Sequence, residues 1–370
     1  FTRKTILKSW KKLNWPKPTL MFFLDCNHTL IKAKAPVIGA FAILLWSCGT
    51  GESPTRPESE TASPDSSAQM LEALDAAILA RPNDPLTYHN RAVWKLDQSN
   101  PQGAFDDWDL ALRADSGFAL AWEQQSEMLF QMQKFEACLE KLDGCLTHAP
   151  ESSTCLLKRA EFAIHLQQFE NAFEYLNDAL RLNNQQHEAY WMKGKIYAMT
   201  GADEKALSSY QTAIEVNPEF FEGFITLGMF LAEKSDPMAE EYYRSAMELN
   251  SMAVEPIYNL AVFYQNQQRL DEARDLYRQI LTLDSENATA SFNQGYIHLE
   301  YRAQYDSAIY WFSEAIERLP YYHQAFFNRG LAYESLGMQR EAIADYSQAL
   351  RIKPDYTAAA RAKERALLGQ

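Results

Sequence analysis

Asparagines at a regular spacing are the side chains of this sequence best suited to recognise another molecule. Asn259, Asn293 and Asn328 follow one another at intervals of 34 and 35 residues. An asparagine side chain offers one acceptor oxygen and two donor hydrogens, which suits pairing with a peptide backbone. Their repetition therefore indicates recognition of an extended peptide. A purely structural role within a repeated sequence explains the same asparagines equally well.

Catalytic, metal and cofactor chemistry has little support. The sequence contains no phosphate-binding glycine loop, no GxSxG elbow and no HExxH pair. None of the seven histidines has a partner at metal-ligand spacing, and the five cysteines include no CxxC pair. We therefore predict no catalytic residue, no metal site and no cofactor, and we do not expect an enzyme. The histidines are His28, His89, His148, His165, His187, His298 and His323.

A pattern that recurs about every 34 residues runs from residue 85 to the C-terminus. Each copy contains two helix-length stretches with apolar residues at helical spacing. Small residues occupy positions where the two helices must approach, and large residues fill the gap to the next copy. A fixed period of this length is typical of a solenoid, in which stacking supplies the core. The last copy carries the pattern as Gly330, Tyr333, Ala342, Tyr346, Ala349 and Pro354.

This pattern resembles the tetratricopeptide repeat (TPR), and the resemblance covers residues 85–356. It implies an all-α fold, a right-handed superhelical solenoid of antiparallel helix pairs. We expect eight repeats, named here by their first residues: 85, 119, 153, 187, 221, 254, 288 and 323. Repeat 221 is one residue short at Ser235-Asp236-Pro237, and repeat 288 is one residue long around 300–303. We expect altered turns at both places.

The resemblance also implies which residues line the concave groove. In the family, positions two, five, six, nine and twelve of each first helix face inward, and position six here carries the three asparagines. We expect the groove to bind an extended peptide or a partner protein, and not through a carboxylate clamp, because Lys195 is the only base at the clamp's lysine positions. The predicted partner-binding residues are Trp191, Lys195, Ile225, Met229, Tyr258, Asn259, Val262, Phe292, Asn293, Tyr296, Phe327, Asn328 and Leu331.

Two partial elements flank the eight repeats. Residues 68–84 read as a half-repeat, the second helix of a missing first unit. Residues 357–370 read as a capping helix, because their charged side chains suit the solvent-facing end of a solenoid.

The segment before the solenoid resembles the leader of a bacterial lipoprotein. Residues 35–47 form an apolar run after Lys32 and Lys34, too short to span a bilayer but suited to the core of a signal peptide. The run ends in Leu45-Trp46-Ser47-Cys48, which resembles a lipobox. That resemblance implies cleavage before Cys48 and attachment of lipid to it. An ordinary signal peptide with a chance cysteine is the alternative.

The remaining N-terminal assignments follow from composition. Residues 1–47 are assigned to the signal peptide, although residues 1–20 match no targeting pattern and are read as upstream translation or a fragment edge. Residues 48–67 are rich in Ser, Thr, Pro and Glu and are assigned to the lipidated cysteine and a flexible linker. Gly49 is not the aspartate that retains some lipoproteins at the inner membrane. We therefore favour the outer membrane of a bacterial envelope.

Charge and cysteine usage limit the partners further. The chain has a formal charge of −14, and residues 1–47 carry eight Lys or Arg against one acid, so the part from Cys48 onward is near −21. Such a charge repels nucleic acid. Cys138 and Cys145 occupy small-residue positions and are expected to be buried. A disulfide between Cys145 and Cys155 is left open.

The sequence thus predicts a non-catalytic adaptor held in the envelope by a lipid, with other proteins or extended peptides as its partners. The alternative is a structural envelope protein whose solenoid self-associates into a homo-oligomer without any peptide ligand. Replacing the three groove asparagines distinguishes the two, because only peptide capture needs them.

Overall fold

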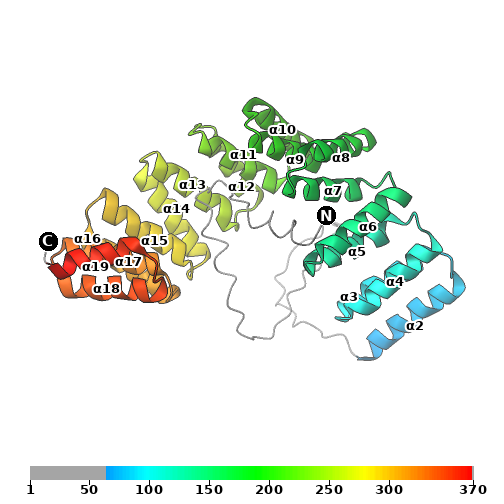
Figure 1. Cartoon of the computed structure of the whole chain (residues 1–370), viewed down its shortest axis with the longest axis horizontal. Coiled ribbons are helices and arrows are strands. Elements are labelled where there is room, and N and C mark those ends of the chain that lie inside the picture. Colours follow the sequence, from blue (N-terminus) through cyan, green and yellow to red (C-terminus); the bar gives the residue numbers. More distant parts are fainter. Residues whose placement is uncertain (1–63, 369–370) are drawn as a thin grey trace, which may run out of the picture. The chain divides into compact units, whose positions relative to one another are not determined.

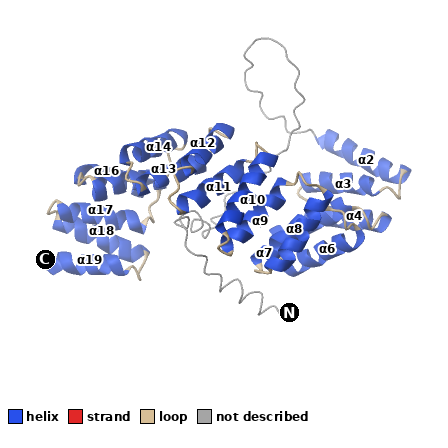
Figure 2. Cartoon of the chain, turned by 90° about the horizontal axis from the view of Figure 1, so that it is seen from above, coloured by secondary structure: helices blue, strands red, loops and turns tan. Residues whose placement is uncertain are grey.

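The computed structural model describes residues 64–368, and every regular element among them is a helix (Figure 1, Figure 2). Consecutive helices pack as pairs, so the all-α array of helix pairs is confirmed. The helices of the first part are α2 (Pro64–Ala80), α3 (Pro85–Asp97), α4 (Pro101–Ala114), α5 (Ala119–Gln131) and α6 (Phe135–His148). They are followed by α7 (Ser153–His165), α8 (Phe169–Leu182), α9 (His187–Met199), α10 (Asp203–Val216), α11 (Phe221–Glu233), α12 (Ala239–Leu249), α13 (Val254–Asn266), α14 (Leu270–Leu283), α15 (Ala288–Tyr296), the π-helix η1 (Ile297–Tyr301), α16 (Tyr305–Arg318), α17 (His323–Ser335), α18 (Gln339–Ile352) and α19 (Thr357–Leu368).

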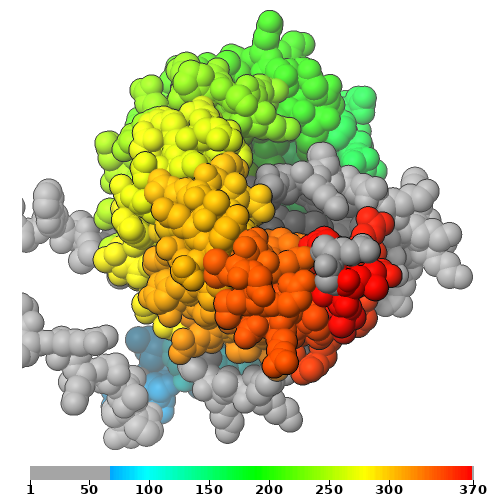
Figure 3. All heavy atoms as spheres, turned by 90° about the vertical axis from the view of Figure 1, so that its left-hand side faces the viewer, coloured from blue at the N-terminus to red at the C-terminus, as the bar shows by residue number. Residues whose placement is uncertain are grey.

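The described chain divides into two compact bodies. The N-terminal body contains the described residues up to Pro150 together with 165–167, and the C-terminal body contains residues 151–164 and those from Gln168 onward. Within the C-terminal body, consecutive repeats lie against one another in chain order, as the yellow-to-red surface of Figure 3 shows. The predicted partner-binding residues all belong to this second body.

The first helix of each repeat begins at the residue where the sequence pattern starts that repeat, from Pro85 to His323. Repeat 85 begins with a proline, which favours a helix start because its fixed φ suits the first turn and its missing N–H is not needed there. Asp84 caps α3 by accepting a hydrogen bond from the Leu86 N–H at 3.0 Å. The half-repeat helix α2 begins at Pro64, earlier than the start at residue 68 expected from the sequence.

The turn between the two helices of each repeat places one residue in the left-handed region of φ. In two repeats this residue is a glycine, and in six it is not. Non-glycine residues pay a conformational cost of roughly 1–2 kcal/mol there. Six of the eight turns are therefore less stable than the same turns would be with glycine at this position. The residues are Ser99, Gln133, Gln167, Gly201, Ser235, Gln268, Ala303 and Gly337.

Close helix approach explains the small residues of the first helices. A Cβ on Gly330 would lie 2.6 Å from the ring of Tyr346, and one on Gly194 would lie 2.6 Å from the ring of Tyr210. Each of these rings comes from the second helix of the same repeat. The small-residue position of the second helix, represented by Ala342, is fully buried. The sequence-based assignment of these positions to helix crossings is therefore confirmed.

The two irregular repeats absorb their length changes locally. In repeat 221 the second helix α12 has 11 residues, where the second helices of the other repeats have 14, and it begins only after Pro237. In repeat 288 the extra residue lies in the π-helix Ile297–Tyr301, in which the chain takes one more residue per turn. Gly295, before the π-helix, still lies against the ring of Phe312, after it, as the corresponding glycines and rings do in other repeats. The altered turn expected in repeat 221 is therefore confirmed, whereas in repeat 288 the change lies in the helix before the turn and not in the turn itself.

The signal peptide, the lipid-attachment residue Cys48 and most of the linker lie outside the described residues. No helix among residues 64–368 has the length and the apolar character that crossing a bilayer requires. Cys138 and Cys145 are buried, as expected of small core residues, and Cys155 is buried as well.

Candidate functional site

The predicted partner-binding residues lie on the first helices of five successive repeats, α9, α11, α13, α15 and α17. Spacing within a helix puts positions five, six and nine on one face, because residues three and four apart are neighbours on a helix. Most of these side chains are half-buried, with enough surface to meet a ligand. Three are buried: Ile225 is 4% exposed, Asn259 9% and Asn328 8%. Ile225 thus belongs mainly to the core.

Trp191 is the best-supported aromatic of the face. Its Nε1–H donates to Thr226 Oγ1 of the next repeat at 3.0 Å, and its ring meets that of Phe220 edge-on at 5.8 Å. Lys195 Nζ lies 4.4 Å from the centre of the Trp191 ring. Burial lowers the pKa of the Lys195 ammonium, and the Glu161 carboxylate opposes that shift. The residues thus form a fixed platform with one cation above it.

A similar contact between repeats involves Tyr258. The Tyr258 hydroxyl and the Asn293 side chain are hydrogen-bonded, and burial raises the pKa of this hydroxyl. Position five of one repeat is therefore linked to position six of the next, as Trp191 is linked to Thr226. Thr226 was not among the predicted partner-binding residues. Its place at position six, where other repeats carry asparagine, could have indicated it.

A contact of this kind is absent at Asn328, which follows Phe292 at position five, and at Asn259. The residue at position five before Asn259 is Ile225, which has no polar group. The Nδ2 atom of Asn259 is buried and has no hydrogen-bond partner among residues 64–368. Asn293 and Asn328, by contrast, donate to the carbonyl oxygens of Thr289 and Gln324, both at 3.0 Å. The three asparagines are therefore not equivalent.

The aromatic residues toward the C-terminus form two groups of ring contacts, around Phe292 and around Phe327. The Phe292 ring lies 4.9 Å from that of Tyr322 and 6.3 Å from that of Tyr296, both in stacked orientations. The Phe327 ring meets that of Tyr356 at 5.2 Å. Tyr322 and Tyr356, which precede helices α17 and α19, thus support the Phe292 and Phe327 rings from the adjoining loops. Val262 and Leu331 are half-buried residues of the same face.

Carboxylates at position two border this face, and the sequence analysis did not single them out. Glu188, Glu222 and Glu255 occupy this position in three successive repeats. Burial raises the pKa of Glu255, and the charge of Glu222 raises it further. The middle of the face therefore carries carboxylates on successive repeats, and the Glu222 charge acts on Glu255. Reading position two in register would have revealed these residues.

No group of three or more His, Cys, Asp or Glu side chains among residues 64–368 is arranged to hold a metal ion. The chemistry of the face is therefore that of hydrogen bonds, aromatic contacts and charge.

Comparison with known families agrees with this arrangement. Models of the tetratricopeptide repeat match residues 153–186, 187–220, 258–323 and 323–356. The chain contains tetratricopeptide repeats. In sequence this TPR chain is similar to BBSome complex member BBS4 of Bos taurus, with 27% identity over 240 residues, 63% of this chain and 44% of that protein. It is also 22% identical over 193 residues to Protein O-mannosyl-transferase TMTC3 of Homo sapiens, covering 50% of this chain and 21% of that protein.

The TPR chain thus spans less than half of the length of these two relatives. Among solved structures, the C-terminal part of a TPR repeat-containing protein from Cytophaga hutchinsonii has a similar fold. Its TM-score is 0.54 at 15% identity, over 65% of this chain and 98% of that one. At this identity the likeness concerns the fold alone. TPR proteins generally act as protein-interaction scaffolds and are typically not catalytic.

Proposed function

We propose that the C-terminal body is a scaffold that binds an extended segment of a partner protein along the first helices of repeats 187 to 323. The observation that carries this proposal is the unpartnered Nδ2 group of Asn259. A buried donor without a partner costs about 1–3 kcal/mol, which a ligand can recover by supplying an acceptor. Rotation of the side chain toward the groove would pair this amide with a backbone carbonyl of the bound segment.

Aromatic side chains on both sides of Asn259 would provide most of the binding energy. Trp191, Phe292 and Phe327 are half-buried and held in place by ring contacts, so little side-chain entropy is lost when a ligand covers them. Hydrogen bonds alone contribute only about 0.5–1.5 kcal/mol each. We therefore expect the bound segment to carry apolar residues on either side of the Asn259 contact.

The charge of the face favours a basic partner. Glu222 and Glu255 lie at position two of adjacent repeats, and burial together with the charge of Glu222 raises the pKa of Glu255. A lysine or arginine of the bound segment would relieve this repulsion. A basic residue can satisfy both features at once, since its carbonyl suits Asn259 while its cation suits the carboxylates.

Envelope anchoring is a separate part of the proposal. The apolar run at 35–47 and the Leu45–Cys48 sequence support a signal peptide followed by a lipid on Cys48. A Cys48→Ser variant should then move from the membrane fraction to the soluble fraction and lose incorporated palmitate in a bacterial expression host. Membrane retention of this variant would contradict lipid anchoring without affecting the groove.

Capture from a detergent extract of bacterial envelopes tests the groove. The immobilised full chain is compared with a variant in which Asn259, Asn293 and Asn328 are alanine. A matched control replaces three exposed asparagines of the same body, Asn171, Asn184 and Asn266. Proteins held by the wild type and the control but lost by the groove variant would support the proposal. Equal capture by all three proteins would contradict it, and self-association alone would favour the structural alternative.

A further inference from the structure

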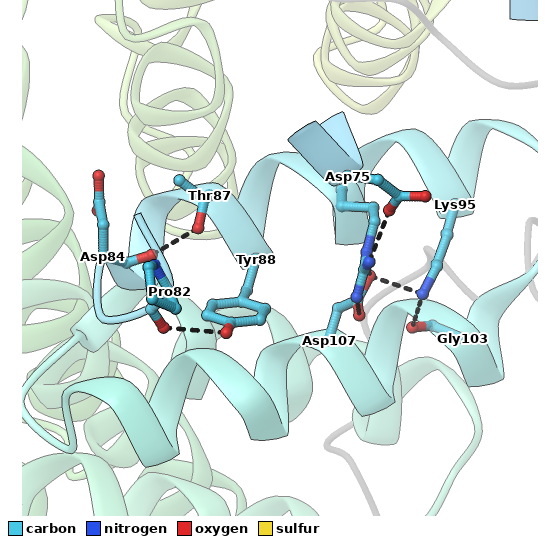
Figure 4. A network of polar contacts seen from close by, with 9 residues as sticks. Asp75, Pro82, Asp84, Thr87, Tyr88, Lys95, Gly103 and Asp107 are labelled. Carbon is cyan, nitrogen blue, oxygen red and sulfur yellow. Dashed lines mark hydrogen bonds and ion pairs between the residues drawn. The ribbon is translucent and has the colours of Figure 1, made fainter. Parts of the chain in front are cut away.

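The seventh residue of the first helix is a cation in several repeats, and in two of them a buried carboxylate pairs with it. In repeat 85, Arg91 Nε and Nη2 donate to both oxygens of Asp107 at 2.9 and 2.6 Å (Figure 4). In repeat 323, Arg329 makes the same two bonds to Asp345 at 2.7 and 2.8 Å. Each aspartate is at position 23, on the second helix of the same repeat. The array thus supplies its own anion in these two repeats.

Repeat 187 has the cation without the carboxylate. Its seventh residue is Lys193, and position 23 is Ser209. Lys193 Nζ donates to Asn177 Oδ1 at 3.1 Å, and no ion pair involves it among residues 64–368. Burial lowers the pKa of the Lys193 ammonium. This charge has therefore lost part of its hydration without gaining a counter-charge.

A cavity of about 380 Å³ lies at this place, between α9 and α10. A second ammonium lines it, that of Lys205, whose Nζ is 5.6 Å from the centre of the Tyr197 ring. The hydroxyls of Ser208 and Ser209 line it too, while that of Thr212 is engaged with the Ser208 carbonyl at 2.9 Å. Glu204 is an exposed residue of the lining. The complete lining consists of Tyr190, Lys193, Tyr197, Glu204, Lys205, Ser208, Ser209 and Thr212.

We propose that this cavity binds a phosphate monoester group, which takes the place that Asp107 and Asp345 occupy in repeats 85 and 323. A phosphate group presents three acceptor oxygens and about −1.5 to −2 charge, which matches two ammonium groups and two hydroxyl donors. A single carboxylate would leave several of these donors unused. The site is distinct from the peptide-binding face, since none of the residues assigned to that face lines the cavity.

Calorimetric titration of the full chain tests this site. Inorganic phosphate, O-phosphoserine and acetate are compared at equal ionic strength and pH 7.5. We expect saturable binding of both phosphates and at least about tenfold weaker binding of acetate, because acetate carries fewer acceptors and less charge. Tighter binding of phosphoserine than of inorganic phosphate would identify a phosphorylated side chain as the source, and equal binding would identify free phosphate.

Three variants make the test specific to the cavity. Lys193→Gln removes the charge but keeps a donor, and it should weaken phosphate binding by about tenfold or more. Lys353→Gln removes an exposed cation elsewhere and should change nothing. Ser209→Asp introduces the carboxylate that position 23 has in repeats 85 and 323, so it should raise the melting temperature while weakening phosphate binding by about tenfold.

Two results would overturn the proposal. One is the absence of saturable phosphate binding to the wild type. The other is phosphate binding by Lys193→Gln within twofold of the wild type. If Ser209→Asp does not fold, Lys205→Gln replaces it, because removal of the second ammonium must also weaken phosphate binding.

Discussion

The pair formed by Arg329 and Asp345 should determine the stability of the last repeat. Replacing Arg329 by Met keeps most of the side-chain volume but leaves the Asp345 carboxylate without its two charged hydrogen bonds. The two side chains are only 18% and 9% exposed, so water replaces these bonds poorly. Breaking a buried pair by removing one partner costs about 3–5 kcal/mol. We expect about 3 kcal/mol, because Arg329 retains some contact with solvent.

A double-mutant cycle separates the stranded charge from the lost packing. Hydrogen exchange of α17 and α18 in the full chain reports the local opening free energy of each variant. Because most of the cost arises from the unpaired carboxylate, Arg329→Met combined with Asp345→Ala should be more stable than Arg329→Met alone. If the losses of opening free energy in the two single variants simply add in the double variant, the unpaired carboxylate is not the source of the destabilisation, and this prediction is contradicted.

Three further predictions concern stability. Hydrogen bonds from Tyr264, Arg269 and Arg244 outweigh the effect of burial and lower the pKa of Glu240 to about 2. Its ionised form therefore stabilises the fold above pH 4.5, and this contribution is lost as pH falls through about 2. Urea unfolding should show Glu240→Gln less stable than wild type by about 1 kcal/mol at pH 7, with most of this difference lost at pH 2. Gln268→Gly relieves a φ of 63° and should raise stability by about 1 kcal/mol, measured by thermal unfolding. Gln267→Gly is the control, and it should gain no stability because φ is already negative there. Ala342→Leu overpacks a fully buried crossing and should cost about 1–3 kcal/mol, and a neutral result in urea would contradict the assigned register.

The regular part of the fold could be predicted from the sequence because each repeat is short and its key residues have one physical role. A glycine that a tyrosine ring contacts, as Gly330 and Tyr346 do, allows only one register of the two helices. The sequence showed where the repeats are irregular, but not which conformation the chain adopts there. The extra residue near position 300 could equally have lengthened the turn, and only its packing shows that it forms a π-helix.

The candidate binding face was predicted less completely than the fold, because the exposure of its side chains depends on contacts with neighbouring repeats. The register placed Ile225 and Asn259 in the groove, but their burial depends on contacts between adjacent repeats. The unpartnered amide of Asn259 does not follow from its register either, because Asn293 and Asn328 at the same position donate to carbonyl oxygens of their own helices. The cavity beside Lys193 is likewise lined by residues of two helices, α9 and α10, with Ser209 at position 23.

Site-specific photo-crosslinking tests the central claim, that the first-helix face of the C-terminal body holds the partner. A photoreactive residue replaces either Val262, which is half-buried on α13 within this face, or Tyr310, which is 56% exposed on the second helix α16. Both variants are irradiated in living bacteria that express the full chain. We predict a specific crosslinked protein from position 262, lost when Asn259 is alanine, and none from position 310. Crosslinking to that protein from position 310 alone would contradict the proposed binding face.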